Sequence, residues 1–171
     1  PSELRHLVPE VDVDFVPDAQ YSLALCQAIS TGQVLSAYGP PGTGKTEHVA
    51  QICAHLGRPY LFLSGMGGTD PSDYVGMSIL KDGNIEWADG DLAYAVRKGV
   101  VVLFDEPYKC SPQTLMCIQS LTDGRRTLKL NGHPDQAQST LKASDEFRMI
   151  LADNVRGVGD ELGRYAAEVQ D

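Results

Sequence analysis

The sequence predicts an α/β domain built on a mainly parallel β-sheet, and two observations carry this prediction. Short apolar runs suited to buried strands alternate along the chain with longer stretches of helical periodicity, which is typical of βα units. Residues 39–46, Gly-Pro-Pro-Gly-Thr-Gly-Lys-Thr, match the phosphate-loop pattern G-x-x-x-x-G-K-[S/T] and stand between one such run and one such helix. Strand, glycine-rich loop and helix in this order are the context in which the pattern marks a nucleotide site.

The residue types in this loop suit a triphosphate. Gly42 and Gly44 let the backbone curl around an anion with several N–H donors converging on it, and the start of the next helix adds partial positive charge. We expect the Lys45 ammonium to contact the β- and γ-phosphates and the Thr46 hydroxyl to bind Mg²⁺. The predicted nucleotide contacts are Gly39, Pro40, Pro41, Gly42, Thr43, Gly44, Lys45 and Thr46.

The first part of the chain divides at clear boundary signals. Residues 1–17, with three prolines and an acidic alternation, are expected to form an extended lead-in to a domain spanning 18–171. Asp18 is a suitable N-cap for a helix over about 19–29. The elements expected next are a strand at 34–38, the phosphate loop, a helix at 47–56 and a second strand at 60–64. The apolar face expected on the second helix consists of Val49, Ile52, Cys53 and Leu56.

The middle of the chain combines an inserted hairpin with a third strand. Residues 77–87 are expected to form the hairpin, with Asp82-Gly83 as its turn signal. The strand at 100–104 is apolar throughout and is therefore expected to be buried on both faces. Two helices complete this region, a short one starting at 70–73 and another over 92–97.

Beyond the third strand, Ser111-Pro112 is a typical helix start because proline is favoured at the first helical position. The core stripe expected on that helix consists of Leu115, Met116, Ile118 and Leu121. A second hairpin is expected over 126–141, turning around Asn131-Gly132, and a fourth strand over 147–152. Glycines in the last fifteen residues or so are expected to keep the tail irregular.

A second group of candidate site residues follows the third and fourth strands. Asp105 and Glu106 come directly after strand 100–104, and Asp153-Asn154 after strand 147–152. Because ligands collect where parallel strands end, these side chains are expected beside the phosphate loop. We expect Asp105 to hold the Mg²⁺ shell and Glu106 to orient and deprotonate an attacking water. Asn154 could hydrogen-bond the γ-phosphate or that water, but Asp-Asn is equally common in turns.

The composition is that of one globular domain with an acidic surface. The chain has 171 residues, 42% of them hydrophobic, and a net charge of −9, which argues against nucleic acid as a partner. No apolar run approaches the roughly 20 residues that a membrane span needs. The four cysteines form no C-x-x-C pair and no zinc-ligand spacing, which favours reduced thiols and a cytoplasmic protein.

Three further groups of residues are weighed as functional or structural. His48 and His55 lie seven residues apart on one helix, whereas a metal pair prefers four, so packed or solvated histidines are favoured. Trp87 is expected either to close its hairpin or to contact a partner. The second hairpin carries a small basic cluster, expected to be a solvated face, of Arg125, Arg126 and Lys129.

Residues 39–46, Asp105-Glu106 and Asn154, in this order, resemble the AAA+ family of ATPases. Within that family the chain is similar to the branch that carries a hairpin inserted before the strand leading to the acidic pair. This branch includes MoxR-like proteins, magnesium chelatase ATPase subunits and the cobaltochelatase subunit CobS. Residues 8–15 resemble the lead-in of the CobS-like group, and His48 follows the phosphate loop as it does there. Residues 154–160, Asn-Val-Arg-Gly-Val-Gly-Asp, resemble its N-x-x-G-x-G-D signature, and the likeness covers nearly all of residues 8–163.

The resemblance implies an ATPase that takes ATP and Mg²⁺ and couples hydrolysis to remodelling of a partner such as a metal chelatase. It implies a three-layer P-loop sandwich with sheet order 5-1-4-3-2 and self-association into a ring, usually a hexamer. Lys45 is implied as the phosphate contact, with Thr46 and Asp105 at the magnesium ion. Glu106 becomes the catalytic acid and Asn154 the first sensor of nucleotide state. The inserted hairpin would face a partner or the central pore.

Some features depart from the family pattern. The sequence ends at Asp171, before the helical lid and arginine-bearing motif that would come next, and neither Arg156 nor Arg164 matches the arginine-finger position. We therefore expect weak hydrolysis from this chain alone. Asp153 stands where the subgroup carries a small residue, which could perturb the sensor. Two alternative functions stay open, a nucleotide-gated assembly module with little hydrolysis and a small-molecule kinase that uses the same loop.

Overall fold

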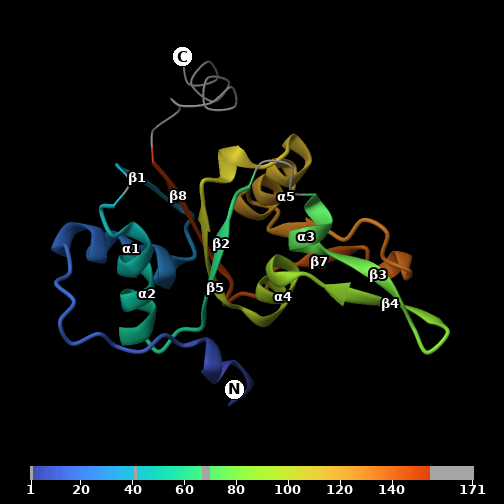
Figure 1. Ribbon diagram of the computed structural model, residues 1–171, viewed down its shortest axis with the longest axis horizontal. Helices are drawn as coiled ribbons and strands as arrows, with labels where there is room; N and C mark the ends of the chain where they lie inside the picture. The colour runs from blue at the N-terminus through green and yellow to red at the C-terminus, as the bar shows by residue number, and fades with distance from the viewer. Residues whose placement is uncertain (1, 41, 67–69, 155–171) are drawn as a thin grey trace.

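The computed structural model describes residues 2–40, 42–66 and 70–154, and a four-stranded sheet lies at its centre (Figure 1). The strands, in sheet order, are β1 (Leu35–Tyr38), β8 (Arg148–Asp153), β5 (Val101–Asp105) and β2 (Tyr60–Ser64). All three pairings are parallel, which confirms the predicted α/β class. Taken as first to fourth along the chain, these strands have the order 1-4-3-2, in agreement with the expected 5-1-4-3-2. The described residues form no strand on the free side of β1, so the fifth strand of that order stays a prediction.

The strand β5 is buried on both faces, as its apolar sequence predicts. Val101 and Leu103 point into the core on one side of the sheet, and Val102 and Phe104 into the core on the other. All four side chains have 0% exposure. Because two layers of helices hold this strand, its carboxyl end is a firm support for the acidic residues that follow it.

Two helices, α1 (Ala19–Thr31) and α2 (Lys45–His55), cover one face of the sheet (Figure 1). Asp18 is the N-cap of α1, as predicted, because its carboxylate accepts a hydrogen bond from the backbone N–H of Tyr21. Val49 and Cys53 of α2 are fully buried. Leu56, predicted on the same apolar face, is 47% exposed because the helix ends before it, so that prediction is wrong.

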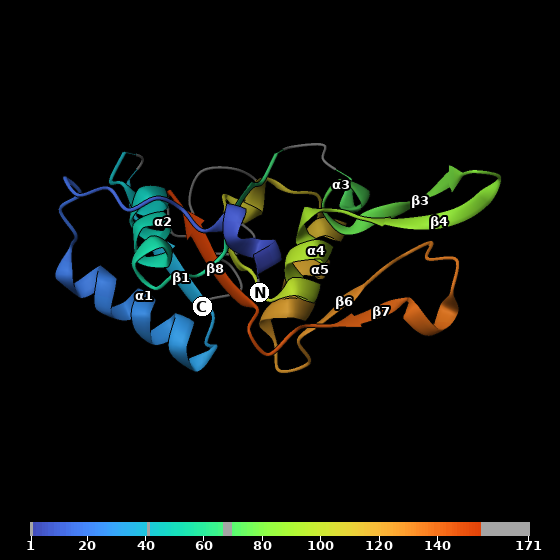
Figure 2. The same ribbon diagram turned by 90° about the horizontal axis from the view of Figure 1, so that it is seen from below.

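The opposite face is covered by α4 (Asp91–Lys98) and α5 (Pro112–Thr122), with the short α3 (Pro71–Val75) beside them (Figure 2). Ser111 caps α5, as its sequence predicts, by accepting a hydrogen bond from the backbone N–H of Thr114. Ile118 and Leu121 are buried, but Met116, predicted in the same stripe, is 69% exposed. Met116 lies two residues before Ile118 and is therefore turned by about 200° around the helix, away from the core.

Two antiparallel hairpins extend from this side of the molecule (Figure 2). The first consists of β3 (Gly76–Lys81) and β4 (Asn84–Asp89), as predicted. Its turn residues Asp82 and Gly83 both have positive φ, which the mirror-image hairpin turn requires. Trp87 is half-buried, donates from Nε1 to the carboxylate of Asp89 at 2.8 Å and tilts against the His133 ring. Trp87 therefore joins the first hairpin to the loop of the second.

The second hairpin, β6 (Thr127–Lys129) with β7 (Thr140–Lys142), is shorter than predicted. Residues 130–139 connect its strands and include a 3-10 helix at Gln136–Gln138, so Asn131-Gly132 is not a tight two-residue turn. Arg125 and Lys129 are exposed, as the predicted solvated face requires, whereas Arg126 is half-buried. Arg126 donates to the carbonyl oxygens of Ser144 and Phe147, and Lys129 donates to the Thr140 hydroxyl.

The lead-in is not extended throughout, because Ser2–Leu7 form a 3-10 helix. Beyond it, the lead-in is bound to α2 by the buried Gln51 side chain, which accepts from the N–H of Asp12 at 2.9 Å and donates to the Glu10 carbonyl oxygen at 3.2 Å. His48 is buried as well. Its ring contacts those of Phe15 and Tyr21, and its Nε2 lies 2.8 Å from the Ser22 hydroxyl. The favoured prediction of a packed histidine is confirmed for His48.

All four cysteines are free, as expected. Burial raises the pKa of the Cys53 thiol to about 12, so this sulfur stays protonated at neutral pH. Within the part of the chain that the structure describes, no helix is long and apolar enough to cross a membrane.

Candidate functional site

The phosphate loop leads from the carboxyl end of β1 into the first turn of α2. Gly42 and Gly44 have φ values of 79° and 73°, in the left-handed region that glycine adopts without strain. A Cβ added at either position would meet no atom within 4 Å, so the need for glycine is conformational rather than steric. Gly44 is the N-cap of α2 and makes no side-chain cap, which leaves the first N–H groups of the helix available to an anion. Pro41 lies outside the described residues.

Lys45 folds back over this loop. Its Nζ donates to the carbonyl oxygens of Gly39 at 2.8 Å and Pro40 at 3.0 Å, and it lies 3.4 Å from Asn154 Oδ1. Its ammonium and the backbone donors of the loop and helix are what a bound phosphate requires. The residues present therefore fit a nucleotide phosphate group. Thr46, on the first turn of α2, is exposed.

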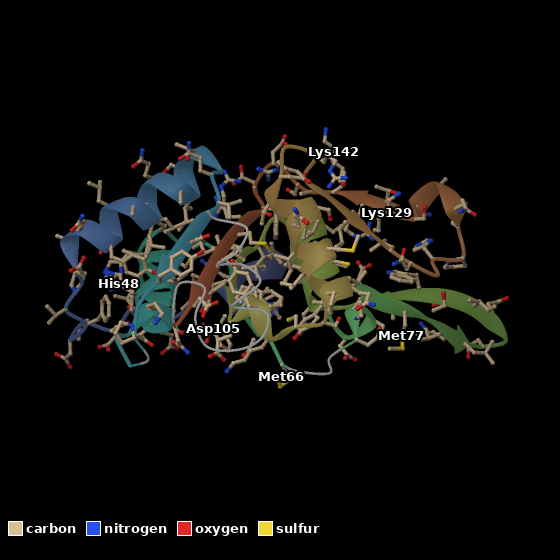
Figure 3. All side chains as sticks on the ribbon, turned by 90° about the horizontal axis from the view of Figure 1, so that it is seen from above. His48, Met66, Met77, Asp105, Lys129 and Lys142 are labelled. Carbon is tan, nitrogen blue, oxygen red and sulfur yellow. The ribbon has the colours of Figure 1, made fainter. Side chains whose placement is uncertain are left out.

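Asp105 ends β5, between the two neighbouring strands of the sheet. Asp105, labelled in Figure 3, lies in register opposite Ser64 of β2 and Ala152 of β8. Burial raises the pKa of its carboxyl group, the negative charge of Glu106 raises it further, and Lys45 opposes both. Because the Lys45 charge acts on this carboxyl group, the phosphate loop and Asp105 belong to one electrostatic site. Hydroxyl and carboxylate oxygens are the ligands that Mg²⁺ prefers, and the predicted metal role of Thr46 and Asp105 stays a prediction.

Glu106 follows in a left-handed backbone conformation, with φ of 49° and ψ of 50°. Its N–H donates to the Ala152 carbonyl oxygen at 2.8 Å, which ties it to β8. Its carboxylate accepts two side-chain hydrogen bonds of 2.7 Å, on Oε1 from Asn154 Nδ2 and on Oε2 from Lys109 Nζ. A non-glycine residue with positive φ is strained, and such strain is concentrated at functional sites.

Gly65 is the site residue that sequence reasoning missed on the β2 side. A Cβ added there would lie 2.2 Å from the Glu106 carbonyl oxygen, and the Gly65 N–H donates to the Asp105 carbonyl oxygen at 2.7 Å. No larger residue fits without moving the acidic pair. Its position directly after a strand was the available signal, but the contact partner lies far along the chain.

Lys109 is the second residue missed. Pro107–Lys109 form a single 3-10 turn, which brings the lysine back to the carboxylate three residues before it. The available signal was the three-residue spacing of Glu106 and Lys109. This spacing brings the two side chains together only if the backbone between them forms a helical turn.

Asn154 stands at the end of β8 and connects the two halves of the site. Its Oδ1 faces Lys45 and its Nδ2 binds Glu106, and its own N–H donates to the Asp153 carboxylate at 2.7 Å. The structure therefore brings Lys45, Glu106 and Asn154 together, as the sequence predicts. Asp105 lies close enough for the charges of Lys45 and Glu106 to shift the pKa of its carboxyl group. Asp153, which could perturb the predicted sensor, accepts its hydrogen bond from the backbone N–H of Asn154 and leaves the side-chain amide on Glu106. Residues 155–160 of the predicted glycine signature, together with Arg156 and Arg164, lie outside the described residues.

A parallel sheet with a glycine-rich phosphate loop on one strand and an acidic pair on a neighbouring strand defines a P-loop nucleotide-binding domain. Residues 37–166 match the family model described as AAA domain (dynein-related subfamily). The chain therefore belongs to this family of AAA ATPases, which implies nucleotide binding.

Curated relatives agree with this assignment. Over 116 residues, 68% of this chain, it is 33% identical to Protein NorQ of Paracoccus denitrificans and covers 42% of that protein. Over 164 residues, 92% of this chain, it is 30% identical to the aerobic cobaltochelatase subunit CobS of a Sinorhizobium species and covers 48% of it. The chain thus spans less than half the length of these relatives.

The fold has a counterpart among solved structures. The crystal structure of a Cytophaga hutchinsonii protein described as a candidate ATPase superposes with a TM-score of 0.58, at 16% identity, over 93% of this chain and 43% of that one. At this identity the likeness concerns the fold alone.

Proposed function

We propose that this protein hydrolyses ATP and couples the hydrolysis to remodelling of a partner complex. The observation that carries the proposal is the side chain of Asn154, which contacts both the lysine of the phosphate loop and the candidate catalytic acid. A residue so placed is suited to relate the state of the nucleotide to the position of the acid. Family membership supports nucleotide binding. Glu106 supplies a group that can activate water, which a domain that only binds nucleotide does not need.

The residues would divide the chemistry as follows. Lys45 and the N–H groups at the start of α2 bind the phosphates and neutralise charge that develops on them. Glu106 orients a water molecule and accepts its proton. Asn154 hydrogen-bonds a terminal phosphate oxygen and so reads its presence. Thr46 and Asp105 would hold Mg²⁺, which neutralises phosphate charge when bound.

The client is proposed by analogy with relatives. CobS is a subunit of an aerobic cobaltochelatase, and another relative, from Ancylobacter aquaticus, is a gas vesicle ATPase. We propose that this chain, or the longer protein to which it belongs, assembles into a ring in the cytoplasm and acts on a protein complex of this kind. The negative net charge does not favour nucleic acid as the client.

Phosphate release with Mg-ATP, measured across protein concentration for the wild type and Glu106→Gln, tests the proposal. We expect turnover per subunit to rise with concentration, because neighbouring subunits complete the site, and to vanish in the variant while ATP binding is kept. Equal turnover in both proteins would contradict the role given to Glu106. Binding without Glu106-dependent turnover would favour the assembly module, and a phosphorylated small molecule without matching free phosphate would favour the kinase.

A further inference from the structure

Lys109 holds one oxygen of the candidate catalytic acid. The turn Pro107–Lys109 begins immediately after Glu106, and the Lys109 N–H donates to the Glu106 carbonyl oxygen at 3.0 Å. The same lysine then places its Nζ 2.7 Å from Glu106 Oε2. The side chains are 50% exposed for Lys109 and 20% for Glu106, so the lysine approaches from the solvent side.

The two oxygens of Glu106 therefore differ in what they face. Oε1 receives its hydrogen bond from Asn154, whose Oδ1 lies 3.4 Å from Lys45 in the phosphate loop. Oε2 receives its hydrogen bond from Lys109, which lies in the turn directly after Glu106. Oε1 is thus the oxygen directed toward the phosphate loop, and Oε2 is the oxygen by which the carboxylate is held.

The backbone of Glu106 is fixed independently of the Lys109 side chain. Its left-handed conformation is held by the hydrogen bond to Ala152, by the close approach of Gly65 and by the buried Pro107 that follows. What remains free is rotation of the side chain, and a glutamate side chain has considerable rotamer freedom. Asn154 binds Oε1 through Nδ2 while its Oδ1 accepts from Lys45, so one amide is shared between the two halves of the site. Lys109 restrains the other oxygen, Oε2, through a short hydrogen bond between charged groups.

We propose that Lys109 is a positioning residue for hydrolysis, which anchors Oε2 so that Oε1 is presented to the water on the phosphate side. This inference rests on the proposed ATPase function. The lysine acts through Glu106 rather than on the nucleotide itself. When the Asn154 amide turns to a phosphate oxygen, the Lys109 contact keeps the acid oriented.

The test is steady-state phosphate release by the full chain, with ATP varied, for the wild type, Lys109→Met, Lys109→Arg and Glu106→Gln. We expect Lys109→Met to lower kcat about tenfold, within the roughly hundredfold that misplacement of a catalytic group can cost. The KM for ATP should stay unchanged, because the phosphate contacts are intact. Lys109→Arg, which keeps the cation, should recover most of the lost kcat.

Lys98→Met is the matched control. It breaks another partly exposed ion pair, with Glu3 at 3.1 Å, on the last turn of α4, and it should leave kcat unchanged. Unchanged or higher kcat in Lys109→Met, an equal loss in Lys98→Met, or failure of Lys109→Arg to recover activity would each overturn the positioning role. If the wild type and Glu106→Gln release phosphate equally, both this inference and the proposed function fail. A Glu106-dependent wild type with an unaffected Lys109→Met would overturn the inference alone.

Discussion

The side-chain amide of Asn154 donates a 2.7 Å hydrogen bond to the carboxylate of Glu106, which lies 48 residues earlier in the chain. The two residues directly follow neighbouring strands, β8 and β5, whose register brings their ends together. Asn154 Oδ1 faces Lys45 on the other side. One amide group therefore links the phosphate loop to the candidate base.

Replacing Asn154 with alanine tests this link. We expect turnover to fall roughly ten- to hundredfold, somewhat below the effect of removing a preorganised donor to a developing charge. ATP affinity should fall by less than turnover does, because Lys45 and the loop backbone still bind the phosphates. Parallel measurement of phosphate release and of ATP binding checks the prediction. A large loss of affinity with unchanged turnover would assign Asn154 to binding instead.

Lys45→Ala is expected to abolish useful nucleotide binding. The phosphates lose their main cation, and hydrogen bonds to charged groups contribute about 1.5–3 kcal/mol, which corresponds to a loss of affinity on the order of a hundredfold. Titration with ATP, followed by heat release or by a fluorescent analogue, gives the affinity. Lys142→Ala, an exposed lysine of β7 (Figure 3), is the control and should bind as the wild type does. Equal affinity in Lys45→Ala would remove the basis for the site.

Gly65→Ala should destabilise the fold and reduce turnover together. The added Cβ would lie 2.2 Å from the Glu106 carbonyl oxygen, so the backbone of the acidic pair has to move. Overpacking of this kind costs about 1–3 kcal/mol of unfolding free energy. Urea unfolding monitored by the single tryptophan, with phosphate release beside it, measures both effects.

Gly124→Ala is the matched control for that substitution, because a Cβ there meets no atom within 4 Å and the residue does not have positive φ. It should unfold within about 0.5 kcal/mol of the wild type, as surface substitutions usually do. If Gly65→Ala proved as stable and as active as Gly124→Ala, the close packing of β2 against Glu106 would not be needed for the site.

Much of this architecture follows from local sequence signals. β5 is recognisable because a run of five apolar residues, 100–104, is typical of a strand buried between two helix layers, and the first hairpin because Asp82-Gly83 suits its turn. The phosphate loop and Glu106 come from residue types that phosphate chemistry demands. Each of these signals is contained within a few neighbouring residues.

The remaining features depend on contacts between distant segments. Leu56 and Met116 carry apolar side chains that the sequence places in the core, but helix length and rotation leave them exposed. Gly65 and Lys109 matter only through Glu106, and nothing in their own neighbourhoods shows where that carboxylate lies. The 3-10 helix at residues 2–7 is likewise tied to tertiary packing, because its Leu4 is buried in the core.

The acidity of Asp105 gives a prediction about pH. Burial and the charge of Glu106 raise the pKa of its carboxyl group above the ordinary value of 3.8, so the folded protein holds this proton more tightly than the unfolded chain. Stability attributable to Asp105 is therefore greatest below its unfolded pKa and is lost as pH rises through its folded pKa.

Asp105→Asn removes the charge and keeps the shape. We expect the variant to unfold at a higher temperature than the wild type at pH 7, and the difference to shrink as the pH falls toward 4. Thermal unfolding at several pH values without nucleotide measures this, and a variant less stable at pH 7 would show that Asp105 is held mainly by favourable contacts such as its attraction to Lys45.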